Sequence, residues 1–335
     1  MKAIFKSSLA ALGLVLAPAD SRAEPWQWAN PAPSWTAVVA REVQAYGEQH
    51  KPTAVMIVHN GRAIASWGEI GRKVNVRSVR KSLLSALYGI AVSDGRIDLA
   101  STLGQLGIDD KPPSLTDAEK QATVRQLLMA RSGVYHPAAY ESKDMTEKRP
   151  ARGSHLPGSF WYYNNWDFNA LGTIYQKATG EDIFQSFKRR IAGPTGMEDF
   201  SDRDGRYVSN ADSVHAAYPF TMTARDLARF GQLILDGGRW NGAQVVPGEW
   251  ITQSTTSYSQ TDRGDRGYGY CWWVLPPERW GAGAAVAAGH GGQVVAVIPA
   301  KRLVLVQTLL ISGTATGIRG RDTLDLLQKI VAAIP

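Results

Sequence analysis

The stretch RSVRKSLLSALYGIAV, residues 77–92, places a lysine inside a segment that the pattern predicts to be a buried helix. Apolar residues cover most of its circumference, and a helix that is apolar nearly all round is normally buried. Burying an unpaired ammonium among apolar residues costs free energy, so a lysine at position 81 indicates a functional role for this side chain. Ser78 lies three residues earlier, so its hydroxyl and the Lys81 amine share one helix face, one turn apart. This geometry predicts a serine nucleophile beside its base.

The surroundings of Lys81 favour an amine that has lost its proton. Arg77 and Arg80 place positive charge beside it, and burial and the positive end of the helix dipole act in the same direction. A neutral amine can accept the Ser78 proton, and the amide at the helix start can stabilise a developing oxyanion. These features together predict acyl transfer. The alternative is that Lys81 extends to the surface and Ser78 only caps the helix.

A second segment, FWYYNNWDFNALG at residues 160–172, is rich in aromatic and amide side chains. Two pairs compete there, because Tyr162 with Asn164 and Tyr163 with Asn165 both give Tyr-x-Asn. The register in which phenylalanine, leucine and glycine follow selects Tyr163 and Asn165. A phenol near a lysine can shuttle a proton to a leaving group, and a carboxamide can hold the lysine and the substrate. The alternative is an aromatic core patch with an asparagine helix cap.

A third segment, GHGGQVVAVI at residues 289–298, puts a histidine and two glycines at the mouth of a predicted strand. Glycine lets a substrate lie against a strand, which assigns Gly291 and Gly292 to substrate binding. We expect the Gln293 amide to supply the second half of an oxyanion hole and His290 to face the far side of the substrate. A purely structural histidine is the alternative.

These motifs, in this order and spacing, resemble the serine β-lactamase and penicillin-binding-protein superfamily. The resemblance is strongest to its class C-like branch of esterases, D-amino-acid peptidases and 6-aminohexanoate-dimer hydrolases. It extends from about Val55 to about Leu310 through SVRKSLLSALYGIAVSDGRIDL, VRQLLMARSGV, YYNNWDFNALGTIYQKATG, GPTGMEDF, TARDLARFGQLILDGGRWNG and GYGYCWW. The resemblance implies an α/β sandwich with a helical lobe and an active site between them.

The resemblance also implies roles for individual residues. They are Ser78 as the acylated nucleophile, Lys81 as its base, Tyr163 as the proton shuttle, Asn165 as the organiser, and His290 to Gly292 as the third motif on the sheet edge. His-Gly-Gly stands where β-lactamases and transpeptidases usually have Lys-Thr-Gly, so the cation and hydroxyl that hold an antibiotic carboxylate are missing. This departure argues against efficient β-lactamase activity. Asn164 in place of the usual serine, and GPTGM in place of Pro-Leu-Gly-Met, leave the nucleophile untouched.

The elements that must position these motifs differ along the chain. Apolar runs around Asn60-Gly61 predict a strand hairpin, and the signals are mainly helical from Ser78 to about Ala224. The segments YGYCWWVL, QVVAVI and RLVLVQTLL then predict strands before a last helix over about 320–334.

The predicted fold is therefore an α/β (α+β) sandwich, β-lactamase/transpeptidase-like. Its antiparallel sheet, from residues 24–77 and 225–335, is flanked by helices, and residues 78–224 form an inserted helical lobe. The long polar stretch between Tyr135 and Phe160 is either a rim of the active site or a plain surface loop.

The N-terminus predicts export. Residues 1–23 combine a basic start, a short apolar run and small residues before a cleavage site after Ala23, which is typical of a signal peptide. The mature domain, residues 24–335, contains no segment apolar enough to span a membrane, so we expect a periplasmic or secreted protein without stable membrane insertion.

Composition excludes several other classes of function. The formal charge is +7 for the whole chain, and cleavage removes Lys2, Lys6, Arg22 and Asp20, which leaves +7 − 3 + 1 = +5. Its basic residues are scattered among acids, so we expect no nucleic-acid partner. With one cysteine, Cys271, and no Cys/His cluster of metal-site spacing, we expect no disulfide and no metal.

The sequence thus predicts a serine hydrolase that cleaves a small-molecule ester or amide through a Ser78 acyl-enzyme and needs no cofactor. One alternative within the same fold is a D,D-peptidase or β-lactamase acting on peptidoglycan or penicillins. Another is a non-catalytic sensor module of the penicillin-binding type.

Overall fold

The computed structural model describes residues 25–30, 33–311 and 317–335. The predicted signal peptide and its cleavage site lie outside the described residues. In the part of the chain that is described, no helix combines the length and apolarity needed to cross a bilayer.

An eight-stranded antiparallel sheet forms the centre of the molecule, in the order β2-β1-β12-β11-β10-β9-β8-β7. Both ends of the chain build it, as predicted, because β1 pairs with β12 from Ala54↔Thr308 to His59↔Leu303. The strands are β1 Ala54–His59, β2 Arg62–Gly68, β7 Ser259–Gln260, β8 Gly267–Tyr268, β9 Trp273–Val274, β10 Ala285–Gly289, β11 Gln293–Ile298 and β12 Leu303–Thr308. The turn at Asn60 and Gly61, both at positive φ, closes the predicted hairpin of β1 and β2.

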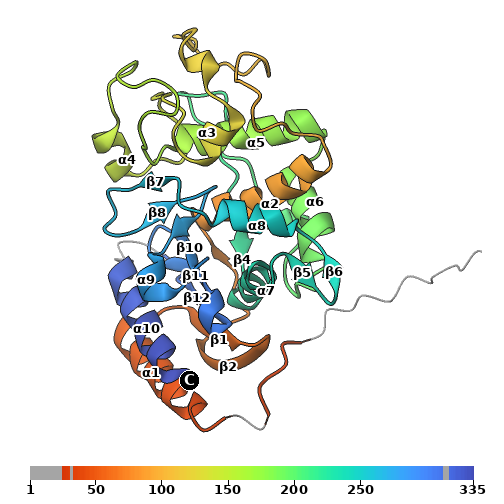
Figure 1. Ribbon diagram of the computed structural model, residues 1–335, viewed down its shortest axis with the longest axis vertical. Coiled ribbons are helices and arrows are strands. Elements are labelled where there is room, and N and C mark those ends of the chain that lie inside the picture. The colour runs from red at the N-terminus through yellow and green to blue at the C-terminus, as the bar shows by residue number, and fades with distance from the viewer. Residues whose placement is uncertain (1–24, 31–32, 312–316) are drawn as a thin grey trace, which may run out of the picture.

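Helices cover both faces of this sheet (Figure 1). Val304 of β12 lies against Gly231 of α7 (Ala224–Leu235), whereas Gln307 accepts a hydrogen bond from Tyr46 of α1 (Thr36–His50). Because these two β12 residues are three apart, they point to opposite faces, and α1 and α7 therefore flank the sheet from opposite sides. The last helix, α10 (Gly320–Ala333), packs beside α1. The predicted fold class is confirmed.

The helical lobe lies above the sheet in Figure 1. Its helices are α2 Val79–Ser93, α3 Val124–Leu128, α4 Lys143–Lys148, α5 Asn165–Thr179 and α6 Ile183–Phe187. The chain enters the lobe through β3 (Val74–Asn75) and leaves it through β4 (Thr221–Met222), and these two strands pair with each other. The exact division into regions at residues 77/78 and 224/225 stays a prediction.

One predicted strand is wrong. The segment YGYCWWVL is divided into β8 and β9 by a turn in which Cys271 has a φ of 63°. Tertiary contacts explain the break, because the Cys271 amide donates to the Leu128 carbonyl and its own carbonyl accepts from Ser82 Oγ. The remaining elements are β5 Arg239–Trp240 paired with β6 Ala243–Gln244, α8 Gly248–Ser254 and α9 Pro277–Trp280.

Candidate active site

Ser78 lies at the N-terminal boundary of α2, directly after a residue in the left-handed region. Arg77 has a φ of 54°, and its amide donates to Asn75 Oδ1 at 2.9 Å. Non-glycine residues rarely adopt such φ values, and they gather at functional turns. Ser78 makes no side-chain capping bond; its Oγ instead accepts a hydrogen bond of 3.1 Å from Lys81 Nζ. The helix-cap interpretation of Ser78 is therefore wrong.

Lys81 is buried, with 1% of its surface exposed, so it does not extend to solvent. Its Nζ donates to the Tyr163 hydroxyl at 2.7 Å and lies over the Phe168 ring, 4.3 Å from the centroid. Burial is the main cause that holds the pKa of Lys81 well below its ordinary value, and the charge of Arg80 acts in the same direction. Arg77, the other predicted contributor, lies against the Tyr140 ring instead.

The two candidate tyrosines make different contacts in the structure. The Tyr163 hydroxyl contacts Lys81, whereas the Tyr162 hydroxyl donates to the Met145 carbonyl at 2.6 Å. Burial raises the pKa of Tyr163 to about 12, although its contact with Ser78 opposes this shift. The phenol therefore keeps its proton at neutral pH, and Lys81 is the better proton acceptor of the two.

Asn165 lies in the site but does not make the contact predicted for it. Its Nδ2 donates to the Tyr140 carbonyl at 2.6 Å, and no hydrogen bond to Lys81 is present among the described residues. Its Oδ1 is buried and has no partner there, so one acceptor stays available in the site. Asn164 is the helix cap, because its Oδ1 accepts from the Trp166 amide at the start of α5.

The third motif lies at the mouth of β11, as predicted. His290, Gly291 and Gly292 form the turn between β10 and β11, and the His290 side chain is exposed. The glycines have φ values of 84° and 103°, and a Cβ on Gly291 would lie 2.1 Å from Ile311 Cδ1. The turn and its packing against the chain's own C-terminal segment therefore require these glycines. Their role in substrate binding stays a prediction.

Gln293 begins β11, and its carboxamide is fully used within the protein. Its Nε2 donates to the Leu309 carbonyl at 2.6 Å, and its Oε1 accepts from the Leu309 amide at 3.1 Å. The side chain thus ties β11 to the segment after β12. The role of its backbone amide stays a prediction.

Gly289, the last residue of β10, is a contact that the sequence interpretation missed. A Cβ there would lie 2.5 Å from the Val76 carbonyl and 3.1 Å from Arg77 Cβ. The end of β10 therefore packs directly against the residues before Ser78. β9 pairs with β10 only as far as Val286, so residues 287–289 pair with β11 alone.

A cavity of about 510 Å³ opens beside Tyr163. Its walls are Arg131, Asp144, Met145, Lys148, Ser159, Phe160, Trp161, Tyr162, Tyr163, Gln260, Thr261, Asp262 and Arg263. Five of them come from the polar stretch 135–160, which is therefore a rim of this cavity and not a plain surface loop. The segment TDRGDR at residues 261–266 forms the other rim; its dense charge between two strands was the signal that could have revealed it.

Four charged side chains on the two rims neutralise one another. Lys148 contacts Asp144 at 3.1 Å and Asp262 at 3.0 Å, and Arg263 contacts the same two carboxylates. This ring of ion pairs joins α4 to the segment between β7 and β8. It leaves the cavity with aromatic walls and four charges that are paired with one another. Arg131, another wall residue, donates to the Gly158 carbonyl and to Ser259 Oγ.

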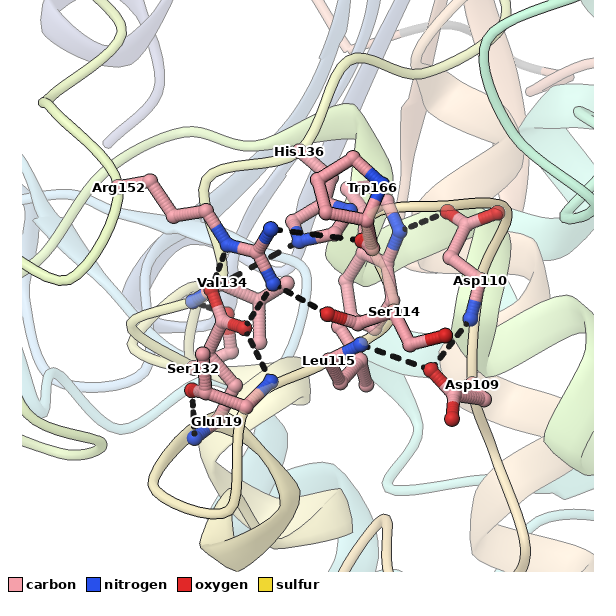
Figure 2. Close-up of polar contacts among 12 residues, drawn as sticks. Asp109, Asp110, Ser114, Leu115, Glu119, Ser132, Val134, His136, Arg152 and Trp166 are labelled. Carbon is pink, nitrogen blue, oxygen red and sulfur yellow. Dashed lines mark hydrogen bonds and ion pairs between the residues drawn. The ribbon is translucent and has the colours of Figure 1, made fainter.

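A partly buried polar cluster connects the polar stretch 135–160 to residues 114–119 of the lobe (Figure 2). Arg152 donates to both carboxylate oxygens of Glu119, at 3.2 and 2.8 Å, and to the Ser114 carbonyl. Behind this pair lies His136, whose pKa is lowered mainly by burial. The residues described contain no group of three His, Cys, Asp or Glu side chains placed to hold a metal ion.

Comparisons with known proteins bear on this geometry. A family model described as Beta-lactamase matches residues 39–327. The 6-aminohexanoate-dimer hydrolase of Paenarthrobacter ureafaciens is 24% identical over 324 residues, which cover 86% of this chain and 81% of that protein.

Two solved structures share the fold. A provisionally assigned 6-aminohexanoate-dimer hydrolase from Bacillus anthracis aligns with a TM-score of 0.70 at 21% identity, covering 93% of this chain and 87% of that one. A beta-lactamase from Mycobacterium bovis aligns with a TM-score of 0.59 at 21% identity, covering 88% and 97%.

Proposed function

The chain belongs to the beta-lactamase family of serine hydrolases, and we propose that it cleaves a small-molecule ester or amide through an acyl-enzyme on Ser78. The observation that carries this proposal is the contact of one buried lysine with two hydroxyls. Lys81 Nζ lies 3.1 Å from Ser78 Oγ and 2.7 Å from the Tyr163 hydroxyl. A nucleophile, a base and a proton donor are thus within hydrogen-bond reach of one another.

Acylation follows from these contacts. Neutral Lys81 accepts the Ser78 proton as Oγ attacks the carbonyl carbon, and the carbonyl oxygen becomes an oxyanion. Tyr163 passes its proton to the leaving alcohol or amine as the bond breaks and regains one from Lys81. In the second half, a water attacks the acyl carbonyl carbon and gives one proton to Lys81. The bond from that carbon to Ser78 Oγ then breaks, the proton returns from Lys81 to Oγ, and the acid leaves.

The oxyanion needs backbone donors, and we propose the Ser78 amide as one and an amide of segment 289–293 as the other. The sequence indicates Gln293 as that second donor. Support for the segment as a whole comes from Gly289, whose position against Val76 and Arg77 brings the end of β10 to the nucleophile.

We propose a class C-like esterase or amidase rather than an enzyme acting on penicillins or peptidoglycan. An exposed His290 on a turn offers no fixed cation and hydroxyl for an antibiotic carboxylate. Aromatic walls and four mutually paired charges in the cavity suit a neutral or partly apolar substrate portion. Residues 1–23 support export to the periplasm or the medium.

Intact-protein mass spectrometry tests the proposal. The mature chain and Ser78→Ala are each incubated with a fluorophosphonate and, separately, with penicillin, and turnover of p-nitrophenyl acetate is followed. We expect a fluorophosphonate adduct that is absent in the variant, no lasting penicillin adduct, and steady turnover. A stable penicillin adduct would support the peptidase or sensor alternative. Adduct formation that persists in Ser78→Ala would overturn the assignment of the nucleophile.

A further inference from the structure

Two cationic residues stand next to each other in the buried part of α2. Arg80 and Lys81 are each 1% exposed. Two neighbouring positive charges are unfavourable where water cannot screen them. A guanidinium keeps its proton under all ordinary conditions, whereas an ammonium loses its proton readily when buried. If one of the two becomes neutral, it must be Lys81.

Arg80 is held by neutral groups only. Its Nη2 donates to Asn169 Oδ1 at 2.9 Å, and its guanidinium lies over the Tyr218 ring, 4.2 Å from the centroid. Its Nη1 is buried and has no hydrogen-bond partner. Within the described chain, no carboxylate forms an ion pair with Arg80, so its positive charge is not compensated.

Other groups around Lys81 do not supply the missing negative charge. The thiol of Cys271 faces it, but burial raises the pKa of that thiol to about 12, which keeps it neutral. Asp167 on α5 is buried, which raises the pKa of its carboxyl well above the ordinary value, and its Oδ1 accepts from Ser132 and Asn164, not from Arg80 or Lys81. Of the other elements that pack on α2, α6, β10 and β11 carry no ionisable side chain, and Glu249 of α8 is exposed.

We propose that Arg80 is the positioning residue that keeps Lys81 in its neutral, proton-accepting form through an uncompensated buried charge. This inference rests on the proposed function, in which Lys81 takes the Ser78 proton. Arg77, although adjacent to Ser78, is held against Tyr140 and does not have this effect. Arg80 itself touches neither Ser78 nor the substrate path and acts only through Lys81.

The size of the effect follows from Coulomb's law. In an effective dielectric of about 20, a unit charge about 6 to 12 Å from a titrating group shifts its titration by roughly two to one pH units. Removal of the Arg80 charge should therefore raise the pKa of Lys81. The pH below which kcat/KM falls (the acidic limb of its profile) should rise by about one to two pH units. At a pH below the pKa of Lys81 in both enzymes, kcat/KM of the variant should be about 10- to 100-fold lower than that of the wild type.

The experiment is a pH profile of kcat/KM for p-nitrophenyl acetate between pH 5 and 9, which reports groups of the free enzyme. The variants are Arg80→Met, which removes the charge, and Asn169→Asp, which adds a counter-ion 2.9 Å from Arg80 Nη2. We expect the pH at which kcat/KM falls on the acidic side to rise in both. Arg77→Met is the matched control and should not move the limb.

The outcomes separate this inference from the proposed function. Activity that survives Ser78→Ala would overturn the proposed function itself. Loss of activity in Ser78→Ala, with limbs of Arg80→Met and Asn169→Asp that coincide with the wild type, would overturn the role of Arg80 alone. An equal rise in Arg77→Met would also overturn it. If Arg80→Met does not fold, Asn169→Asp decides, because it keeps the shape of the side chain and gives up only the hydrogen bond from Nδ2 to the Ala139 carbonyl.

Discussion

Arg152→Met should destabilise the protein, because it removes the hydrogen bonds that join the polar stretch 135–160 to Glu119 and Ser114. The Glu119 side chain is only 4% exposed and Arg152 is 30% exposed, so their pair is neither fully buried nor a surface contact. Breaking a buried pair costs about 3–5 kcal/mol, whereas an exposed pair contributes about 0.2–1 kcal/mol. We therefore expect a loss of about 2 kcal/mol at pH 7, because methionine retains the apolar stem but leaves Glu119 without its cation.

The pH dependence of this loss identifies its cause. Burial raises the pKa of Glu119, but hydrogen bonds from Arg152 and from the Thr116 amide outweigh burial and leave the pKa below its ordinary value. A carboxyl with a lowered pKa stabilises the fold above its unfolded pKa of about 4.3, and this contribution is lost as the pH falls through the folded pKa. The destabilisation by Arg152→Met should accordingly be largest above about pH 5 and shrink toward pH 4.

Equilibrium urea unfolding of the wild type, Arg152→Met, Glu119→Gln and the double variant measures the effect and the coupling energy of the pair. Lys143→Met is the matched control on the same rim, because its pair with Glu147 is exposed at 3.5 Å; it should change stability by less than about 0.5 kcal/mol. A loss for Arg152→Met no larger than that control, or an equal loss at pH 7 and pH 4, would refute the reasoning.

Two further predictions concern the catalytic contacts. Tyr163→Phe should lower kcat/KM for p-nitrophenyl acetate by about 10²- to 10⁴-fold because the proton shuttle is lost, and Tyr162→Phe should change it far less; equal effects would contradict the choice of Tyr163. Gly289→Ala should cost about 1–3 kcal/mol in urea unfolding and lower turnover, because its Cβ would lie 2.5 Å from the Val76 carbonyl. Gly320→Ala is its control, because a Cβ there meets nothing within 4 Å. Equal stability and turnover in the two variants would contradict the prediction, because β10 would then accommodate the Cβ without loss.

Local patterns were sufficient for much of the fold. The apolar circumference of residues 77–92 predicted a buried helix, found as α2 at residues 79–93, and the burial of Lys81, because helix periodicity depends only on near neighbours. The start of α7 is equally local, because Thr223 accepts from the Asp226 amide. The choice of Tyr163 over Tyr162 rested on the spacing of the residues that follow, which can be read from the sequence. The contact of the Tyr163 hydroxyl with Lys81 agrees with that choice.

Features that depend on distant residues could not be predicted in this way. A glycine pair that opens space for a substrate and one that closes a tight turn look alike in sequence, so the positive φ values of Gly291 and Gly292 and their packing against Ile311 and Ile318 were not predicted. Strand-favouring residues on both sides of Cys271 concealed a turn that contacts with Leu128 and Ser82 impose. The neutral surroundings of Arg80 depend on Asn169, 89 residues away along the chain.

The two strained positions near α2 connect the fold to the chemistry. Arg77, before the first turn, and Cys271, beside it, are both non-glycine residues at positive φ, which costs about 1–2 kcal/mol each. Each is held by hydrogen bonds: the Arg77 amide donates to Asn75, and the Cys271 carbonyl accepts from Ser82 Oγ at 2.7 Å. Strain of this kind persists only where surrounding contacts over-determine it. Both positions border the first turn of α2, which carries Ser78 and Lys81. Contacts from the sheet and from the lobe therefore hold this turn together, and the position of the buried base depends on both.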